Sequence, residues 1–152
     1  MGAAGDGKLT AMNAVVAYHS RNGHTRRAAD AIVAELAKRG AEARLLPVER
    51  LTTVEVEAAD IVFLGTWAQG LFVFAVRPAG MARWLPALPS LGGTPTAAFA
   101  TYRFRPAGLL QTFGDAVRSK GGRLVASHAF QRDRLDGNVG KFVDQALAGR
   151  AA

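Results

Sequence analysis

The sequence predicts an α/β protein with a doubly wound, five-stranded parallel sheet, and three observations lead to this prediction. The chain has 152 residues, of which 49% are hydrophobic, which suits one domain with a single buried core. Short apolar runs recur along it, as expected for strands that are covered on both faces. Between these runs, apolar residues recur at every third or fourth position, the spacing of helices with one buried face. Strands and helices that alternate in this way are typical of a three-layer α/β sandwich.

Five segments are predicted to be strands. Residues 13–18 and 61–64 are almost wholly apolar, and the second of these runs is expected to end at Gly65. Residues 42–48 alternate charged and apolar side chains and then carry Pro47, which has no N–H to donate, so this strand is expected at an edge of the sheet. The remaining strands are predicted at residues 96–101 and 124–126.

Five segments are predicted to be helices. The first follows Thr25, has a candidate C-cap in Gly40, and buries one side formed by Ala28, Ala29, Ile32, Val33 and Leu36. Pro78 suits the first turn of a helix that continues through Trp84. The others are predicted at residues 51–58, 106–120 and 138–147. The apolar run at residues 71–76 is interpreted as a loop or helical turn beside the site, with a true strand as the alternative.

The ends of the chain and its composition indicate a cytoplasmic protein. Residues 1–11 are small, polar and glycine-rich and are predicted to be a disordered extension of a domain spanning residues 12–150. No apolar run approaches the ~20 residues that span a bilayer, and the N-terminus does not resemble a secretory signal. We therefore expect no stable membrane association. The absence of cysteine excludes disulfides and thiolate metal sites.

The net charge of +7 suggests an acidic partner, but it does not indicate nucleic acid. Basic residues are scattered and form no consecutive block of the kind that marks a nucleic-acid-binding tail. The sequence therefore predicts no nucleic-acid binding.

Residues 14–25 combine an apolar strand, a tight polar turn and the start of a helix, which is the layout of a phosphate site. A helix N-terminus leaves backbone N–H groups without partners and carries about half a positive charge. Ser20, Asn22 and Thr25 offer further donors, and Gly23 allows the backbone to turn closely. The alternative is a plain surface turn in which Ser20 or Thr25 caps the helix.

Ligands in doubly wound sheets bind beyond the carboxyl ends of the strands. The ligand-binding loops are therefore expected at residues 19–25, 65–76, 102–106 and 127–137. A dinucleotide-binding G-x-G-x-x-G and a nucleotide P-loop are both missing after the first strand. A phosphate-accepting receiver domain needs acidic residues at the ends of the first and third strands. Those ends read Tyr18-His19-Ser20 and Leu64-Gly65-Thr66, so these three functions are excluded.

The sequence resembles the flavodoxin family. The phosphate loop of that family has the pattern [ST]-x-[TN]-G-x-T, which is matched by Ser20-Arg21-Asn22-Gly23-His24-Thr25. Residues 59–66 are similar to the family's third strand and second flavin loop, and residues 100–102 are similar to its third flavin loop. The resemblance covers residues 13 to about 147 and implies the strand order 2-1-3-4-5.

By this resemblance the cofactor is flavin mononucleotide (FMN). Its phosphate is expected to be held by Ser20, Asn22 and Thr25 together with the backbone of Arg21, Gly23 and His24. The ring is expected between Trp67 and Tyr102, and stacked aromatic rings influence both affinity and potential. Gly70 offers a backbone group near the flavin N5. The second and third flavin loops add Thr66, Ala68, Thr101 and Arg103.

Two departures from the family affect the expected partner. Flavodoxins are usually acidic around the flavin, whereas arginines here lie in or beside the predicted ligand loops: Arg21, Arg77, Arg103, Arg105, Arg132 and Arg134. They predict an acidic redox partner protein or an anionic substrate. The apolar residues 71–76 replace a polar loop and suggest a flavin cap, a hydrophobic substrate site or a contact in a homodimer. Phe72 or Phe74 is then an alternative to Trp67 as the stacking residue.

The histidines do not predict a metal site. His19 and His24 flank the phosphate turn and His128 is expected to end the fifth strand, but no i, i+4 pair and no nearby acidic residue supports a metal site. Solvent-exposed positions, or positions one layer behind the ligand, are expected for their side chains.

Two functional classes remain, with a third as an alternative. The first is a flavodoxin-like electron carrier, monomer or homodimer, and it is favoured because the short loop between Tyr102 and Pro106 leaves little material for a large substrate pocket. The second is an FMN-dependent oxidoreductase acting on a quinone, a porphyrinogen or NAD(P)H. The third is an interaction module that has lost the flavin.

Overall fold

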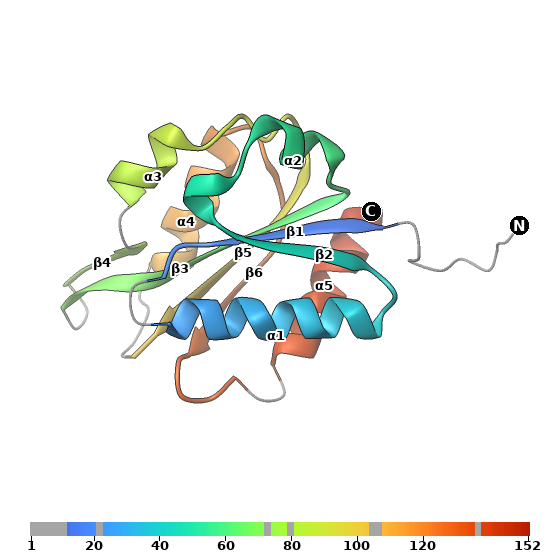
Figure 1. Cartoon of the computed structure of the whole chain (residues 1–152). Coiled ribbons are helices and arrows are strands. Elements are labelled where there is room, and N and C mark those ends of the chain that lie inside the picture. Colours follow the sequence, from blue (N-terminus) through green and yellow to red (C-terminus); the bar gives the residue numbers. More distant parts are fainter. Residues whose placement is uncertain (1–11, 21–22, 72–73, 79–80, 104–107, 136–137) are drawn as a thin grey trace, which may run out of the picture.

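The computed structural model describes residues 12–20, 23–71, 74–78, 81–103, 108–135 and 138–152. Within these ranges it forms a six-stranded sheet in which five strands are parallel in the order β2-β1-β3-β5-β6, while β4 pairs with β3 (Figure 1). The strands are β1 (Asn13–Tyr18), β2 (Glu42–Pro47), β3 (Ile61–Leu71), β4 (Phe74–Pro78), β5 (Pro95–Tyr102) and β6 (Arg123–Gln131). Counted without β4, this is the predicted order 2-1-3-4-5, and the doubly wound sheet is confirmed. The predicted extension at residues 1–11 lies outside the described residues, and the domain limits stay a prediction.

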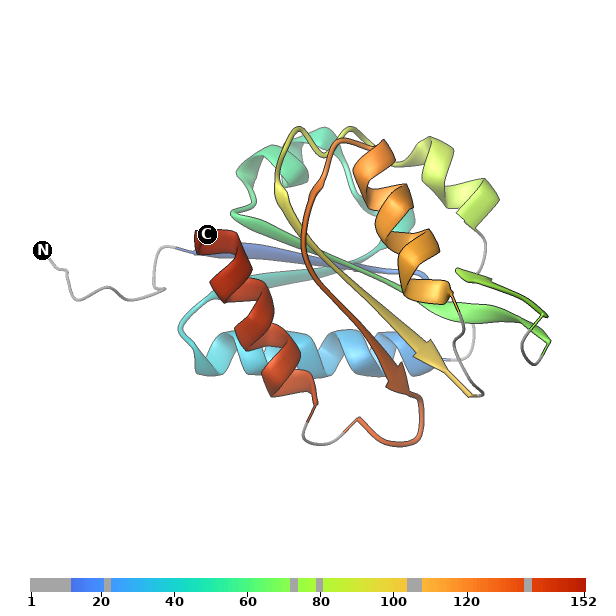
Figure 2. The same ribbon diagram turned by 180° about the vertical axis from the view of Figure 1, so that it is seen from behind.

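Helices cover both faces of the sheet, so the molecule has three layers (Figures 1 and 2). On one face lie α1 (His24–Lys38) and α5 (Val139–Ala151), and on the other lie α2 (Thr53–Ala58), α3 (Met81–Ala87) and α4 (Leu109–Ser119). A 3₁₀ turn, η2 (Val48–Arg50), precedes α2. No helix in the described part of the chain has both the length and the apolar composition to cross a membrane.

The apolar runs of the strands are explained by the two buried faces. Because successive side chains of a strand point to opposite sides, β1 sends Val16 to the core beneath α1 and α5, and Val15 to the core beneath α2, α3 and α4. Both side chains are buried, which is why the run shows no polar alternation. The predicted edge strand is also confirmed, since β2 pairs with β1 alone among the described strands.

The stretch at residues 71–76 is not the predicted loop or helical turn. β3 does not end at Gly65 but continues to Leu71, and β4 returns antiparallel to it with Ala68 opposite Pro78. The alternative of a strand is therefore correct for residues 74–76, while residues 72–73 lie outside the description. A short apolar run does not distinguish a strand from a helical turn by periodicity, and only the pairing with β3 decided it.

Other boundaries of strands and helices also differ from the predicted ones. Pro78 ends β4 instead of opening a helix, and α3 begins at Met81 and continues past Trp84 to Ala87. β6 continues to Gln131, whereas residues 127–131 were predicted to belong to a ligand loop. β6 is an edge strand whose side chains are mostly half-buried, so its apolar run is shorter than the strand itself.

Gly65 allows β3 and β5 to approach each other where the ligand edge begins. It lies opposite Phe99 in the parallel pairing, and a Cβ at this position would come within 2.1 Å of the Phe99 ring. The Phe99 side chain is completely buried, so the ring has no free space to move into. Glycine at position 65 is therefore required by packing.

Candidate functional site

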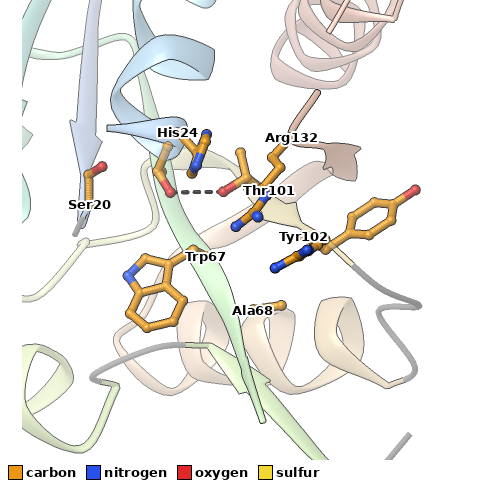
Figure 3. Close-up of a pocket in the computed structure, with 9 residues that line it drawn as sticks. Ser20, His24, Trp67, Ala68, Thr101, Tyr102 and Arg132 are labelled. Carbon is orange, nitrogen blue, oxygen red and sulfur yellow. Dashed lines mark hydrogen bonds between the residues drawn. The ribbon is translucent and has the colours of Figure 1, made fainter. Parts of the chain in front are cut away.

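A pocket of about 130 Å³ opens where β1, β3, β5 and β6 end (Figure 3). It receives residues from the start of α1, from β3, from the end of β5 and from the segment after β6. Its lining consists of Ser20, His24, Thr25, Trp67, Ala68, Thr101, Tyr102, Arg103 and Arg132. The fold thus brings together residues from all four of the predicted ligand segments at one edge of the sheet.

The turn after β1 is held by backbone geometry and by a serine. Gly23 has a φ of 84°, a left-handed conformation that glycine adopts without strain, and α1 starts at the next residue. Ser20 Oγ accepts hydrogen bonds from the N–H groups of Gly23 at 3.1 Å and Arg26 at 3.4 Å. Ser20 therefore contacts the first turn of the helix, but the N-cap is Gly23 and not Ser20 or Thr25 as the capping alternative expected. The hydroxyl proton of Ser20 is still available to a ligand.

A pair of buried threonines connects α1 with β5. The hydroxyl oxygens of Thr25 and Thr101 are 3.0 Å apart, and both side chains are buried at the floor of the pocket. Only one of the two hydroxyls donates in this contact, so the accepting hydroxyl keeps its proton for a ligand. The pair places a donor beside the N-terminus of α1.

Three polar atoms of the pocket lining are buried and have no hydrogen-bond partner within the described structure. They are Nδ1 of His24, Nε1 of Trp67 and Nε of Arg132. Leaving a buried polar group unpaired costs about 1–3 kcal/mol. All three atoms belong to residues of the pocket lining.

The aromatic candidates lie on opposite sides of the pocket. Trp67 pairs with Thr101 across β3 and β5, and Tyr102 follows Thr101 at the end of β5. Figure 3 shows the two rings apart, with Ala68 between them. Trp67 belongs to the extension of β3 and not to the loop that was predicted there. Phe72 lies outside the described residues and the side chain of Phe74 is not described, so these alternatives stay predictions.

The other predicted cofactor residues have varied positions. Arg103 lines the pocket and is exposed, whereas the Thr66 side chain is completely buried where β3 pairs with β5. Gly70 lies farther along β3, beside an irregularity in the pairing with β4. Arg21 and Asn22 lie outside the described residues. The roles expected for all of these residues stay predictions.

The fold places the predicted arginines in different environments. Arg132 was expected to face a partner, but its side chain lines the pocket. Arg134 is exposed and borders a neighbouring groove together with Tyr102 and His128. Arg77 lies in β4, and Arg105 is outside the described residues. Sequence patterns gave no signal for the inward position of Arg132, because it depends on where β6 ends.

The histidines also differ from expectation. The side chain of His24 lines the pocket, whereas only its backbone was expected to contact the phosphate. His128 lies within β6 instead of at its end, and its ring packs 4.6 Å from that of Phe130. Burial lowers the pKa of His128, so its ring is neutral at pH 7. Among the described residues, no group of three His, Cys, Asp or Glu side chains converges to hold a metal.

Comparisons with known proteins agree with this geometry. Residues 15–70 match the family model of the flavodoxin domain, whereas no curated protein matches the sequence. Flavodoxin from Megasphaera elsdenii, in its two-electron reduced form, has a TM-score of 0.70 and 17% identity over 91% of this chain and 99% of its own.

Two further flavodoxin structures give similar values. The flavodoxin of Streptococcus pneumoniae TIGR4 has a TM-score of 0.69 and 17% identity over 91% of this chain and 97% of its own. The oxidised flavodoxin 2 of Bacillus cereus has a TM-score of 0.67 and 20% identity over 91% of this chain and 98% of its own. At these identities the structures show a shared fold. The chain is thus similar to flavodoxins in sequence over residues 15–70 and in fold over 91% of its length.

Proposed function

We propose that this protein binds FMN in the pocket at the carboxyl ends of the strands and carries electrons to a redox partner. The proposal depends chiefly on one observation. The N-terminus of α1 and the Thr25–Thr101 hydroxyl pair lie at one pocket, whose lining also includes His24, Trp67 and Arg132, each with a buried polar atom that has no partner in the described structure. The similarity of residues 15–70 to the flavodoxin domain supports a flavin nucleotide as the ligand.

The donors of the pocket suit a phosphate group. The first N–H groups of an α-helix have no acceptors within the helix, and the helix dipole favours an anion there. The Ser20 hydroxyl and one hydroxyl of the threonine pair add neutral donors. The pocket of about 130 Å³ is smaller than the ~300–1,000 Å³ that encloses a whole ligand of drug size. It therefore encloses the phosphate end, and the flavin ring extends to the rim.

Trp67 and Tyr102 are the ring contacts in this proposal. Both are half-buried at the rim, one on β3 and one on β5, so each presents an apolar surface to a flat ligand. Their rings exclude water from the flavin, which affects its potential. Bound FMN supplies the one- and two-electron chemistry, and the protein supplies binding, orientation and this environment.

An FMN titration of the purified protein tests the proposal. We expect saturable one-to-one binding with a perturbed flavin absorbance spectrum and quenched flavin fluorescence, because the ring stacks against aromatic side chains. Trp67→Ala should weaken the quenching, whereas Val54→Ala, an exposed change on α2, should leave it intact. Absence of binding at micromolar FMN would contradict the proposal. Rapid direct oxidation of NAD(P)H by the loaded protein would instead favour an oxidoreductase.

The partner of the carrier is an acidic redox protein. Two exposed arginines, Arg103 and Arg134, lie at or beside the pocket rim, and the chain has a net charge of +7. Positive charge around an electron-transfer edge attracts acidic surfaces and speeds their association.

Association kinetics test this partner. The second-order rate of electron transfer to a ferredoxin of net negative charge should fall as ionic strength rises, since salt screens exposed charges. Arg134→Gln should lower that rate at low salt, and Arg118→Gln on α4, where Arg118 pairs with Asp115, should change it less. A rate that does not depend on ionic strength would exclude an electrostatically guided acidic partner.

A further inference from the structure

Arg132 occupies a position unlike that of the exposed arginines near the site. Its backbone N–H donates to the carbonyl of Tyr102 at 2.9 Å, which ties the segment after β6 to the end of β5. Its side chain extends into the pocket, and Figure 3 shows the guanidinium group pointing toward Thr101. Its Nε is buried and has no hydrogen-bond partner within the described structure.

The described structure offers no counterion for this charge. None of the described residues that line the pocket is acidic. Asp133, the next residue along the chain, is exposed. The Arg132 side chain is half-buried, and its buried Nε without an acceptor is costly, which favours an anion from outside the chain as its partner.

The surroundings of the guanidinium identify which part of a ligand it meets. Thr101, toward which it points, is bonded to Thr25 in the first turn of α1. This is the end of the pocket where the helix N-terminus favours negative charge. The ring contacts Trp67 and Tyr102 lie toward the rim instead.

We propose that Arg132 is the counterion of the cofactor's phosphate group and makes the pocket selective for phosphorylated over dephosphorylated flavin. The inference rests on the proposed function and adds a charge to a site otherwise built from neutral donors and a helix dipole. A guanidinium group suits this role because its planar donors match phosphate oxygens, and charge-assisted hydrogen bonds are about twice as strong as neutral ones. The side chain of His24 lines the same pocket.

Calorimetric titration with three probes tests the proposal: FMN, riboflavin and inorganic phosphate. Arg132→Gln should weaken FMN binding by at least about tenfold, and it should leave riboflavin affinity unchanged. Arg132→Lys should recover part of the loss, because it restores the charge without the planar donors. Arg27→Gln on α1 removes the same charge from an exposed position and should change FMN affinity by less than about twofold. Unfolding of each apo-variant is followed to exclude loss of structure.

The outcomes separate this inference from the proposed function. An equal loss of FMN and riboflavin affinity, or no loss of either, would overturn the role of Arg132 toward phosphate. The wild-type protein could bind inorganic phosphate through Arg132 and bind neither flavin. That result would support the anion contact of Arg132 and reject the flavin as the ligand. Phosphate binding that is equal in wild type and Arg132→Gln would overturn the inference even if FMN binds.

Discussion

Replacement of Ser20 and Thr25 together with alanine is expected to weaken FMN binding by at least about a hundredfold. In the proposed site the Ser20 hydroxyl and one hydroxyl of the Thr25–Thr101 pair donate to the phosphate, and hydrogen bonds to charged groups contribute about 1.5–3 kcal/mol each. Ser20 already accepts two N–H groups of the turn, and Thr25 is bonded to Thr101, so both hydroxyls are held in position before the ligand arrives. Little ordering is then needed on binding, which favours affinity. Fluorescence titration of the double variant measures the loss.

The same contacts make a stability control necessary. Thr25→Ala removes a buried hydrogen bond to Thr101, so the double variant is also expected to unfold at a lower temperature. Binding is therefore measured well below its melting temperature. Thr53→Ala, which removes an exposed hydroxyl at the start of α2, serves as the matched control for affinity. A folded double variant with unchanged FMN affinity would show that Ser20 and Thr25 stabilise the helix and do not contribute to FMN binding.

Gly65→Ala is expected to destabilise the protein by at least about 2 kcal/mol, because overpacking a close-packed core forces neighbours out of their rotamers. The new Cβ would lie 2.1 Å from the Phe99 ring, a distance that real contacts do not reach. Phe99 is completely buried in β5, and it packs against α5 through Phe142 at 6.3 Å between ring centroids. The strain therefore spreads from the sheet to a helix. Urea unfolding gives the change in the free energy of unfolding.

A double-mutant cycle shows whether the clash is the cause. Phe99→Leu shortens the side chain, so Gly65→Ala should cost clearly less in that background than in wild type. Gly23→Ala provides a contrast, because no atom lies within 4 Å of its Cβ and only the positive φ of 84° opposes it. That backbone strain costs about 1–2 kcal/mol. Equal effects of Gly65→Ala in the wild-type and Phe99→Leu backgrounds would exclude steric contact as the reason.

Much of the site could be predicted from local sequence. The turn after β1 is specified by an apolar strand, a glycine with positive φ and a helix within a few neighbouring residues, and such short-range preferences do not depend on distant contacts. Trp67 and Tyr102 were predicted from the resemblance to flavodoxins, and both line the pocket, with Trp67 inside β3 and Tyr102 at the end of β5.

The hairpin of β3 and β4 could not be predicted as securely, because the decisive interaction is between two strands. Residues 71–76 are apolar in any interpretation, and the pairing of Gln69 with Arg77 and of Leu71 with Phe74 is what makes residues 74–78 a strand. Pairing energy depends on the partner strand, so propensity alone does not determine it.

The sequence by itself determined the layered α/β architecture, the strand order that the family resemblance implied, and the glycine turn at the start of α1, because periodicity and backbone preference are local properties. Only the tertiary structure decided that Arg132 and His24 face the pocket and that Arg134 faces solvent. These directions depend on where β6 ends and how it packs beside β5, which are contacts between residues far apart in the chain. Arg132 and Arg134 thus lie in different environments, because the fold gives the two arginines different neighbours.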